Sequence, residues 1–258
     1  MFAEERQQAI TELLASAGKV TVADLAQRFE ITRETVRRDL DQLEQLGSLR
    51  RVHGGAVSTL SSSTREESHL VRSTLHADDK ARIARAAFNL IPAADTSILL
   101  DAGSSTGLLA ELIAQSPSEH QHLLITHALP IATSISANPE LPIEFIGGRI
   151  RGLTGAASGS RTVSELDGLS ADIAFVGTNA IDPSFGLSTP DPMEADVKRA
   201  IVAAAKRVVV LADASKFNER SLVRFAELAE IDTLITTGTP DASLASALAD
   251  ADVEVLYA

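Results

Sequence analysis

Seven short apolar runs between residues 97 and 256 constrain the fold more than any other feature of the sequence. Helical patterns lie between several of them, at residues 80–90, 107–114 and 193–205. Strands that are apolar along their whole length and alternate with helices are typical of a parallel sheet covered on both faces. Residues 77–258 are therefore predicted to form a parallel-sheet α/β domain. The seven runs are 97–100, 123–125, 143–146, 173–176, 208–211, 234–235 and 253–256.

The stretch from Thr32 to Leu40 predicts a helix that reads DNA. Thr32 can cap this helix, and an apolar stripe follows at helical spacing: Val36, Leu40, Leu43 and Leu46. Polar residues off that stripe lie in the first two turns, which a helix-turn-helix presents to base edges and phosphates. They are Arg33, Thr35, Arg37 and Arg38. For this stretch alone, an ordinary amphipathic helix with a charged outer face is the alternative.

The flanking residues complete a small DNA-binding module. Residues 4–17 and 21–29 have helical patterns, with Gly18 ending the first helix and Thr21 with Asp24 opening the second. Residues 49–57 alternate around Gly54-Gly55, which predicts a two-stranded wing. Residues 1–57 are thus predicted to be a winged helix-turn-helix whose wing brings Arg50, Arg51 and His53 to DNA.

Charge and composition narrow the class of protein. The net charge is −12, but residues 1–57 hold eight basic against nine acidic residues, so most of the acidity belongs to the larger part. The sequence has no cysteine, and His120 and His122 lack metal-ligand spacing, so we expect surface histidines and no metal site. With no apolar run of transmembrane length and no signal-peptide pattern, we expect a cytoplasmic protein without a membrane partner.

Residues 58–76 are predicted to link the two parts. Residues 58–64 are small, polar and aperiodic, as in a flexible tether. Such a tether would allow the placement of two separately folded parts to change.

The predicted strands of the larger part end in small, hydroxyl and charged residues. After the first strand, Asp101 and Gly103 lead into Ser104, Ser105 and Thr106, whose amides and hydroxyls converge at a helix N-terminus, as in a phosphate cradle. This loop has neither a Walker motif nor a GxGxxG motif. Ordinary turn chemistry explains each strand end taken singly. Because parallel strands end at one rim, the set favours a site for a small polyhydroxylated anion.

The residues of the first part resemble the N-terminal signature of the DeoR family of bacterial transcriptional regulators. The matching residues are Arg6, Ile10, Thr32, Thr35-Val36-Arg37-Arg38-Asp39-Leu40 and Arg51-Val52-His53-Gly54-Gly55-Ala56. The resemblance implies that Thr35, Arg37 and Arg38 lie at the DNA and that Asp39 has a structural or orienting role. We expect Asp39 to hold an arginine in place; accepting a hydrogen bond from a cytosine amino group is the alternative.

A second set of motifs is Asp101 with Gly103 to Thr106, Gly147-Gly148, Gly177, Gly186-Leu187-Ser188-Thr189, Glu194, Lys198, and Asp213 with Lys216-Phe217. With these motifs, residues 77–258 resemble the sensor domain of the same family, which is similar in fold to ribose-5-phosphate isomerase and binds phosphorylated sugars. The sequence departs from the family at His127, where asparagine is common after threonine. The residues expected to bind the effector are Asp101, Gly103, Ser104, Ser105, Thr106, Thr126, His127, Gly147, Gly148, Gly177, Ser188, Thr189, Glu194, Lys198, Asp213 and Lys216.

Within this set, Ser104 to Thr106 are expected to hold the phosphate, with Lys216 or Lys198 as countercharge. Asp101 and Glu194 would accept from sugar hydroxyls. Alternatively, Glu194 and Lys198 pair with each other at the helix surface, because their spacing is i,i+4.

The resemblance predicts a homodimeric or homotetrameric repressor of sugar-catabolism or sugar-uptake genes. Its partners would be double-stranded operator DNA and a phosphorylated sugar, with no cofactor and no catalytic residue. Two alternatives are an isomerase-like enzyme with a helical appendage and a winged module that binds protein. The four arginines Arg37, Arg38, Arg50 and Arg51 disfavour the last.

Overall fold

The computed structural model describes residues 3–45, 49–52, 54–58, 66, 69–116 and 120–258. The chain divides into two compact units, Met1–Arg65 and Glu66–Ala258.

The first unit is a three-helix module with a small sheet. Its elements are α1 (Ala3–Ala17), β1 (Lys19–Thr21), α2 (Val22–Arg28), α3 (Arg33–Gln45), β2 (Leu49–Val52) and β3 (Gly55–Ser58). The strands pair antiparallel in the order β1-β3-β2, so β1 adds a third strand to the predicted wing. Ile10, Leu14, Val36 and Leu40 are fully buried between the helices. This confirms the predicted winged helix-turn-helix.

The helix boundaries of this unit follow from the capping residues seen in the sequence. Gly18 has φ 73° and donates its amide to the Leu14 carbonyl oxygen at 2.8 Å, which ends α1. The Thr21 hydroxyl accepts from the Asp24 amide at 3.1 Å and caps α2. Thr32 does the same for α3, where its Oγ1 accepts from the Thr35 amide at 3.1 Å.

Two consecutive glycines shape the turn of the wing for different reasons. Gly54 has φ 82°, a left-handed conformation that most side chains disfavour. A Cβ atom on Gly55 would lie 2.0 Å from the Val20 carbonyl oxygen, because β3 approaches β1 closely there. Neither position can carry another side chain without a local rearrangement.

The second unit is built on a seven-stranded sheet in the order β15-β14-β12-β9-β4-β5-β6, and every pairing in it is parallel. The strands are β4 (Thr96–Leu100), β5 (His122–Thr126), β6 (Ile143–Phe145), β9 (Ile173–Gly177), β12 (Val208–Leu211), β14 (Thr233–Thr236) and β15 (Glu254–Tyr257). Each corresponds to one of the seven apolar runs, so the predicted parallel α/β fold is confirmed.

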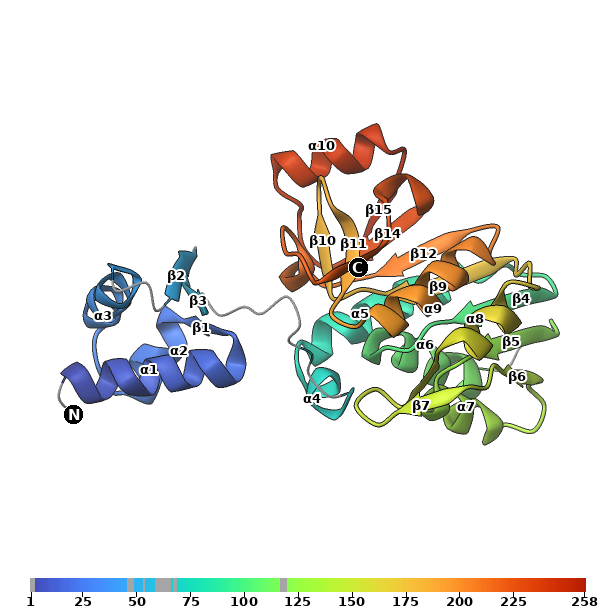
Figure 1. Ribbon diagram of the computed structural model, residues 1–258, viewed down its shortest axis with the longest axis horizontal. Helices are drawn as coiled ribbons and strands as arrows, with labels where there is room; N and C mark the ends of the chain where they lie inside the picture. Colours follow the sequence, from blue (N-terminus) through green and yellow to red (C-terminus); the bar gives the residue numbers. More distant parts are fainter. Residues whose placement is uncertain (1–2, 46–48, 53, 59–65, 67–68, 117–119) are drawn as a thin grey trace. The chain divides into compact units, whose positions relative to one another are not determined.

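Helices cover both faces of this sheet (Figure 1). One core lies against α5 (Ala77–Phe88), α6 (Ser104–Gln115) and α7 (Leu129–Ser136). The other lies against α8 (Ser160–Leu166), α9 (Pro192–Ala203) and α10 (Ala242–Asp250). Within β4, Ile98 and Leu100 join the first core and Leu99 joins the second. Burial on both faces explains why the strand is apolar throughout.

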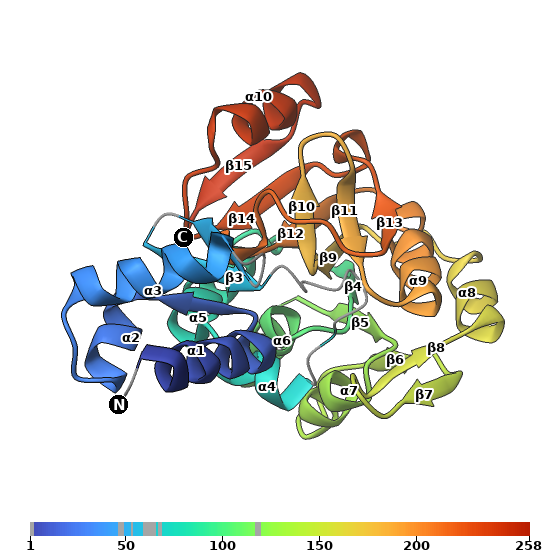
Figure 2. The same ribbon diagram turned by 60° about the vertical axis from the view of Figure 1, so that its left-hand side comes forward.

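Two smaller antiparallel sheets of the second unit were not predicted. The strands β10 (Ala180–Asp182), β11 (Gly186–Thr189) and β13 (Val223–Ala226) form an antiparallel sheet. The strands β7 (Arg149–Arg151) and β8 (Ala156–Ser158) form a hairpin that lies between α7 and α8 (Figure 2). The second unit also contains two 3₁₀ turns, Ala214–Lys216 and Leu228–Glu230.

The predicted linker is described only in part. Residues 59–65 and 67–68 lie outside the described residues. Residues 69–74 form a short helix, α4 (His69–Thr74), in the second unit. The buried Lys80 side chain of α5 donates to the carbonyl oxygens of Arg72 and Leu75, which fixes the end of α4.

Candidate functional site

The outward face of α3 presents the arginines that the sequence assigns to DNA. Arg33, Arg37 and Arg38 are exposed, and the side chains of Arg37 and Arg38 keep 54% and 79% of their surface. Glu34 lies between them, 3.5 Å from Arg37 Nη1 and 4.0 Å from Arg38 Nε. Thr35 is half-buried, with its Oγ1 atom 2.9 Å from Thr32 Oγ1. Exposed ion pairs of this kind are weak, so both arginines remain available to a stronger anion.

Asp39 lies on the inner side of α3 and binds Arg6 of α1. Arg6 Nε donates to Asp39 Oδ2 at 2.5 Å, and Arg6 Nη2 donates to Asp39 Oδ1 at 3.0 Å. Both side chains are at most 10% exposed. The hydrogen bonds to Asp39 raise the pKa of Arg6 despite its burial. Asp39 therefore orients α3 against α1, the structural role that the resemblance implied.

Of the two wing arginines, Arg51 contacts α3. The Arg51 guanidinium pairs with Asp41 and donates to the Arg37 carbonyl oxygen at 3.2 Å. The backbone amide of Arg51 donates to Glu44 Oε1 at 2.7 Å. Arg51 thus fastens the wing to α3, and its contact with DNA stays a prediction. The Arg50 side chain and His53 lie outside the described residues.

A buried polar network lies at the carboxyl ends of the central strands. Asp101 follows β4 and is completely buried. Its Oδ2 atom pairs with the Lys198 ammonium of α9 and accepts from the Gly177 amide at 2.9 Å. Lys198 also donates to the Gly177 carbonyl oxygen at 2.8 Å. Burial raises the pKa of Asp101, but Lys198 and His127 outweigh it and hold that pKa below its ordinary value.

His127 completes this network from the end of β5. Its Nδ1 atom lies 2.8 Å from the Ala157 carbonyl oxygen, so Nδ1 must carry a proton. The neutral ring then accepts at Nε2 from the Ala102 amide at 3.2 Å. A doubly protonated ring would instead donate from Nε2 to Asp101 Oδ1, which lies 3.3 Å away. Thr126 lies beneath, and its hydroxyl donates to the Leu100 carbonyl oxygen at 2.8 Å.

Glu194 and Lys198 do not pair with each other, so the surface-pair alternative is wrong. Both are buried on α9, and while Lys198 reaches Asp101, Glu194 accepts from Arg151 and from the Thr154 hydroxyl at 2.8 Å. Arg151, on β7, was not predicted as a site residue. A basic residue three positions after the Gly147-Gly148 pair was the available signal, but its partners are distant in sequence.

The predicted phosphate cradle is the first turn of α6. Gly103 is the N-cap residue, and no side chain caps the helix. The amides of a first helical turn lack acceptors within the helix, so they can bind an anion. Ser104 is half-buried and Ser105 is buried, whereas the buried Thr106 hydroxyl already donates to the Gly103 carbonyl oxygen at 3.0 Å.

The remaining predicted residues surround this centre or serve the fold. Gly148 has φ 156°, and a Cβ atom there would lie 2.1 Å from Thr162 Oγ1, whose hydroxyl donates to the Gly147 carbonyl oxygen. Asp213 follows β12 and accepts from the Ser215 amide at 2.9 Å. Burial raises the pKa of Asp213, but the Lys216 charge and the hydrogen bonds from Ser215 outweigh burial, so the pKa lies below its ordinary value.

Ser188 and Thr189 lie in the antiparallel sheet and use their hydroxyls there. The Ser188 Oγ atom accepts from the Ser221 amide at 2.9 Å, and Thr189 donates to Asn179 at 3.0 Å. Both side chains are fully buried. Their role in binding the effector stays a prediction.

Family comparisons agree with this geometry in both units. Residues 6–62 match the DeoR-like helix-turn-helix domain, and residues 75–238 match the DeoR C-terminal sensor domain. The chain belongs to the DeoR family.

Named relatives extend the match over the whole length of this DeoR-family chain. It is 34% identical to the HTH-type transcriptional regulator GlpR of Haloferax volcanii, over 99% of this chain and 98% of the relative. It is 31% identical to the glycerol-3-phosphate regulon repressor of Haemophilus influenzae, over 92% and 90%. A ribose-5-phosphate isomerase structure in complex with phospho-erythronic acid is similar with a TM-score of 0.41 and 18% identity, over 55% of this chain and 54% of that one.

These relatives settle the choice between the regulator and the enzyme. The proteins that match over the full chain are named as regulators and repressors. This DeoR-family protein is therefore a DNA-binding transcriptional regulator, not an isomerase with an appendage.

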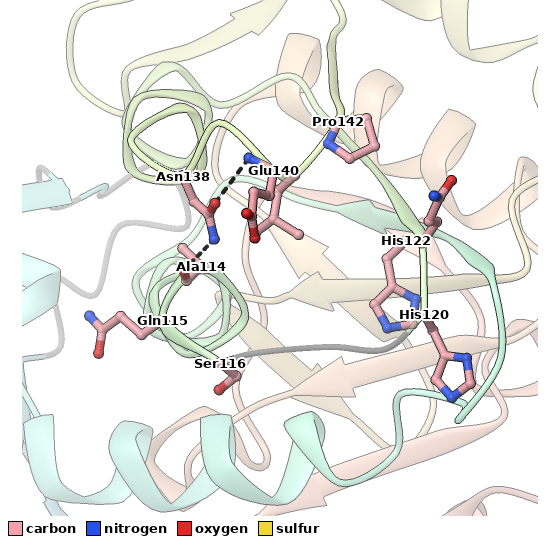
Figure 3. Close-up of a pocket in the computed structure, with 10 residues that line it drawn as sticks. Ala114, Gln115, Ser116, His120, His122, Asn138, Glu140 and Pro142 are labelled. Carbon is pink, nitrogen blue, oxygen red and sulfur yellow. Dashed lines mark hydrogen bonds between the residues drawn. The ribbon is translucent and has the colours of Figure 1, made fainter.

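A hollow of about 390 Å³ lies at the amino-terminal ends of β5 and β6, whereas the Asp101 network lies at the carboxyl ends of the strands. Figure 3 shows the residues that line the hollow. It is lined by the end of α6, the start of β5 and the segment before β6. Asn138 joins two of its walls by donating to the Ala114 carbonyl oxygen and accepting from the Glu140 amide, each at 3.0 Å. His122 lines it and is only 6% exposed, so the expected surface position was wrong for this residue. It is the first residue of β5, an inner strand of the sheet, and burial lowers its pKa.

The described part of the chain contains no group of three or more side chains that could hold a metal ion. No helix in that part is long and apolar enough to span a membrane.

Proposed function

We propose that this regulator is a repressor of sugar-catabolism or sugar-uptake genes and that a phosphorylated sugar controls it from the carboxyl rim of the sheet. The observation that carries the proposal is the Asp101–Lys198–His127 network beside the uncapped N-terminus of α6. Buried polar groups next to a helix N-terminus suit a ligand that is both hydroxylated and anionic.

The charges of the site indicate which residues would bind the phosphate and which would bind the sugar hydroxyls. Lys198 is neutralised by Asp101, so it adds little positive charge toward a ligand. Lys216 makes no ion pair within 4 Å to any carboxylate in the described residues, and it follows β12 at the same rim. Lys216 is therefore the better countercharge for a phosphate held by the α6 amides. Asp101 and Glu194 would accept hydrogen bonds from the sugar hydroxyls.

DNA binding would use two copies of the chain. The exposed arginines of α3 suit one major-groove half-site, and a homodimer or homotetramer would bring two such helices about 34 Å apart, or a multiple of that spacing. An effector that disturbs this spacing removes the contribution of the second half-site. We propose a cytoplasmic location, where the operator DNA is.

The test is fluorescence anisotropy of full-length protein on labelled DNA from upstream of its own gene. The titration is run at two salt concentrations, with and without fructose 1-phosphate, fructose 6-phosphate and glycerol 3-phosphate. We expect salt-dependent binding that one of the sugar phosphates weakens. Binding that no sugar phosphate in a wider panel alters would contradict the effector part of the proposal.

A further inference from the structure

Arg151 links the proposed effector site to the point where the chain enters the second unit. Its guanidinium binds both oxygens of Glu66, with Nη1 3.2 Å from Oε1 and Nη2 2.8 Å from Oε2. Glu66 is the first residue of the second unit, and its side chain is 5% exposed. The two parallel hydrogen bonds give this pair a fixed geometry that a lysine would not provide.

The same guanidinium binds the beginning of α9. Arg151 Nη2 lies 3.2 Å from Asp191 Oδ2, and Nη1 donates to Glu194. Asp191 caps α9 by accepting from the Glu194 amide at 2.9 Å. One guanidinium therefore serves three carboxylates, and the cluster keeps an excess of two negative charges when all are ionised. Such a cluster is sensitive to any ligand that changes the bonding of one member.

α9 carries this cluster directly to the rim of the sheet. Glu194 and Lys198 are one helical turn apart on the same face, and Lys198 binds Asp101 at the end of β4. Polar contacts thus run from Glu66 through Arg151 to Glu194 and from Lys198 to Asp101, and one turn of α9 connects the two sets.

The other end of the entering segment is held by helices of the second unit. Lys80 fixes the end of α4 through the Arg72 and Leu75 carbonyl oxygens. α4 itself contacts α6, whose N-terminus is the proposed phosphate cradle. The segment that leads into the second unit is therefore held at Glu66 by Arg151 and at the end of α4 by Lys80, and α4 also packs against α6.

We propose that the Glu66–Arg151 ion pair couples effector binding to the position of the segment that joins the two units. This rests on the proposed function, because it requires a sugar phosphate at the rim. Sugar hydroxyls that donate to Glu194 change the Glu194–Arg151 ion pair. The resulting change in the position of Arg151 alters its ion pair with Glu66. Coupling is reciprocal, so loss of the ion pair removes the effect of the effector on DNA and the effect of DNA on the effector.

The test combines hydrogen exchange and DNA binding on the full-length protein. Exchange of peptides covering residues 66–76 and 101–107 is measured with and without fructose 1-phosphate, fructose 6-phosphate and glycerol 3-phosphate. The variants are Glu66→Gln, which keeps the size of the side chain but loses its charge, and Asp196→Asn. Asp196 is the matched control because it forms an exposed ion pair with Arg199 on the same helix, away from Arg151.

In wild type and Asp196→Asn, we expect one sugar phosphate to change exchange in both peptides and to change DNA affinity by about 5- to 150-fold. In Glu66→Gln, we expect the change in 101–107 to persist, while the change in 66–76 and most of the change in DNA affinity disappear. A sugar phosphate that alters 101–107 but leaves 66–76 unchanged in wild type overturns the coupling and leaves the effector site intact. Full regulation in Glu66→Gln overturns it as well. Absence of any change in 101–107 across the probes contradicts the effector site itself, and the coupling with it.

Discussion

At the scale of single residues, two buried ion pairs hold the functional surfaces in place. Arg6–Asp39 fixes the DNA-reading helix, and Asp101–Lys198 lies at the centre of the proposed effector site. A buried ion pair adds little net stability, because both charges lose their hydration. Removing one partner is costly, however, since the other charge stays buried without compensation. Each pair therefore fixes geometry more than it adds stability.

Asp39→Ala should destabilise the first unit by about 3–5 kcal/mol, because Arg6 would remain buried without its carboxylate. Native-state hydrogen exchange of α1 and α3 amides in the full chain measures this loss. Glu34→Ala is the matched control, since Glu34 is 63% exposed on the same helix and should change stability by less than about 0.5 kcal/mol. Equal losses in both variants would show that the Arg6–Asp39 pair has no special structural role.

Asp101→Asn should destabilise the second unit by about 3–5 kcal/mol at pH 7, because Lys198 loses its partner. The folded-state pKa of Asp101 lies below its ordinary value of 3.8. The stability that the ionised Asp101 contributes is therefore fully present above pH 3.8 and is lost as the pH falls toward the folded-state pKa. Urea unfolding from pH 7 to pH 3 should show the difference between wild type and variant shrinking below about pH 4. A difference that stays constant to pH 3 would contradict this assignment.

At the scale of elements, local patterns predicted what depends on local physics. Seven apolar runs gave seven strands, and Gly18, Thr21 and Thr32 gave helix ends, because burial and capping act within a few residues. The strands β10, β11 and β13 were not predicted, because runs of three or four mixed apolar and polar residues are too short to show the alternation of a strand.

Contacts between distant parts of the chain were not predictable in the same way. Glu194 and Lys198 have the spacing of a surface pair, yet both point into the unit, because β8, β11 and β13 pack against α9 in addition to the main sheet. Arg151 and Glu66 are 85 residues apart, and no spacing rule connects them. The residues of the rim could be named from the sequence, whereas their partners required the tertiary structure.

The exposed arginines of α3 lead to a prediction for that helix. Arg37→Ala should weaken DNA binding by roughly 1–3 kcal/mol if this arginine reads a guanine, and the loss should be greater on the operator than on unrelated DNA. Arg161→Ala is the matched control, because Arg161 is 83% exposed in the second unit and its loss changes the net charge equally. Anisotropy titrations on both DNAs measure the difference. A similar loss for Arg161→Ala would mean that total charge, not α3, determines affinity.

At the scale of the whole molecule, the two units have different charges and different tasks. The DNA-binding unit is nearly neutral, with Arg33, Arg37 and Arg38 exposed on α3, while most of the net charge of −12 lies in the sensor unit. An acidic sensor is repelled by DNA, so we expect the affinity for DNA to come from the small unit. In the proposed function, the effector would have to favour one placement of the small units over another.

The claim that a ligand at the rim governs DNA binding is tested most directly by a charge reversal in the phosphate cradle. Operator binding of wild type, Ser105→Ala and Ser105→Glu is measured by anisotropy with and without the active sugar phosphate. We expect all three proteins to bind the operator equally without ligand, and only Ser105→Glu to lose the response, because its carboxylate repels the phosphate at the first turn of α6. A full response in Ser105→Glu would contradict the account, because the effector would then bind somewhere other than this rim.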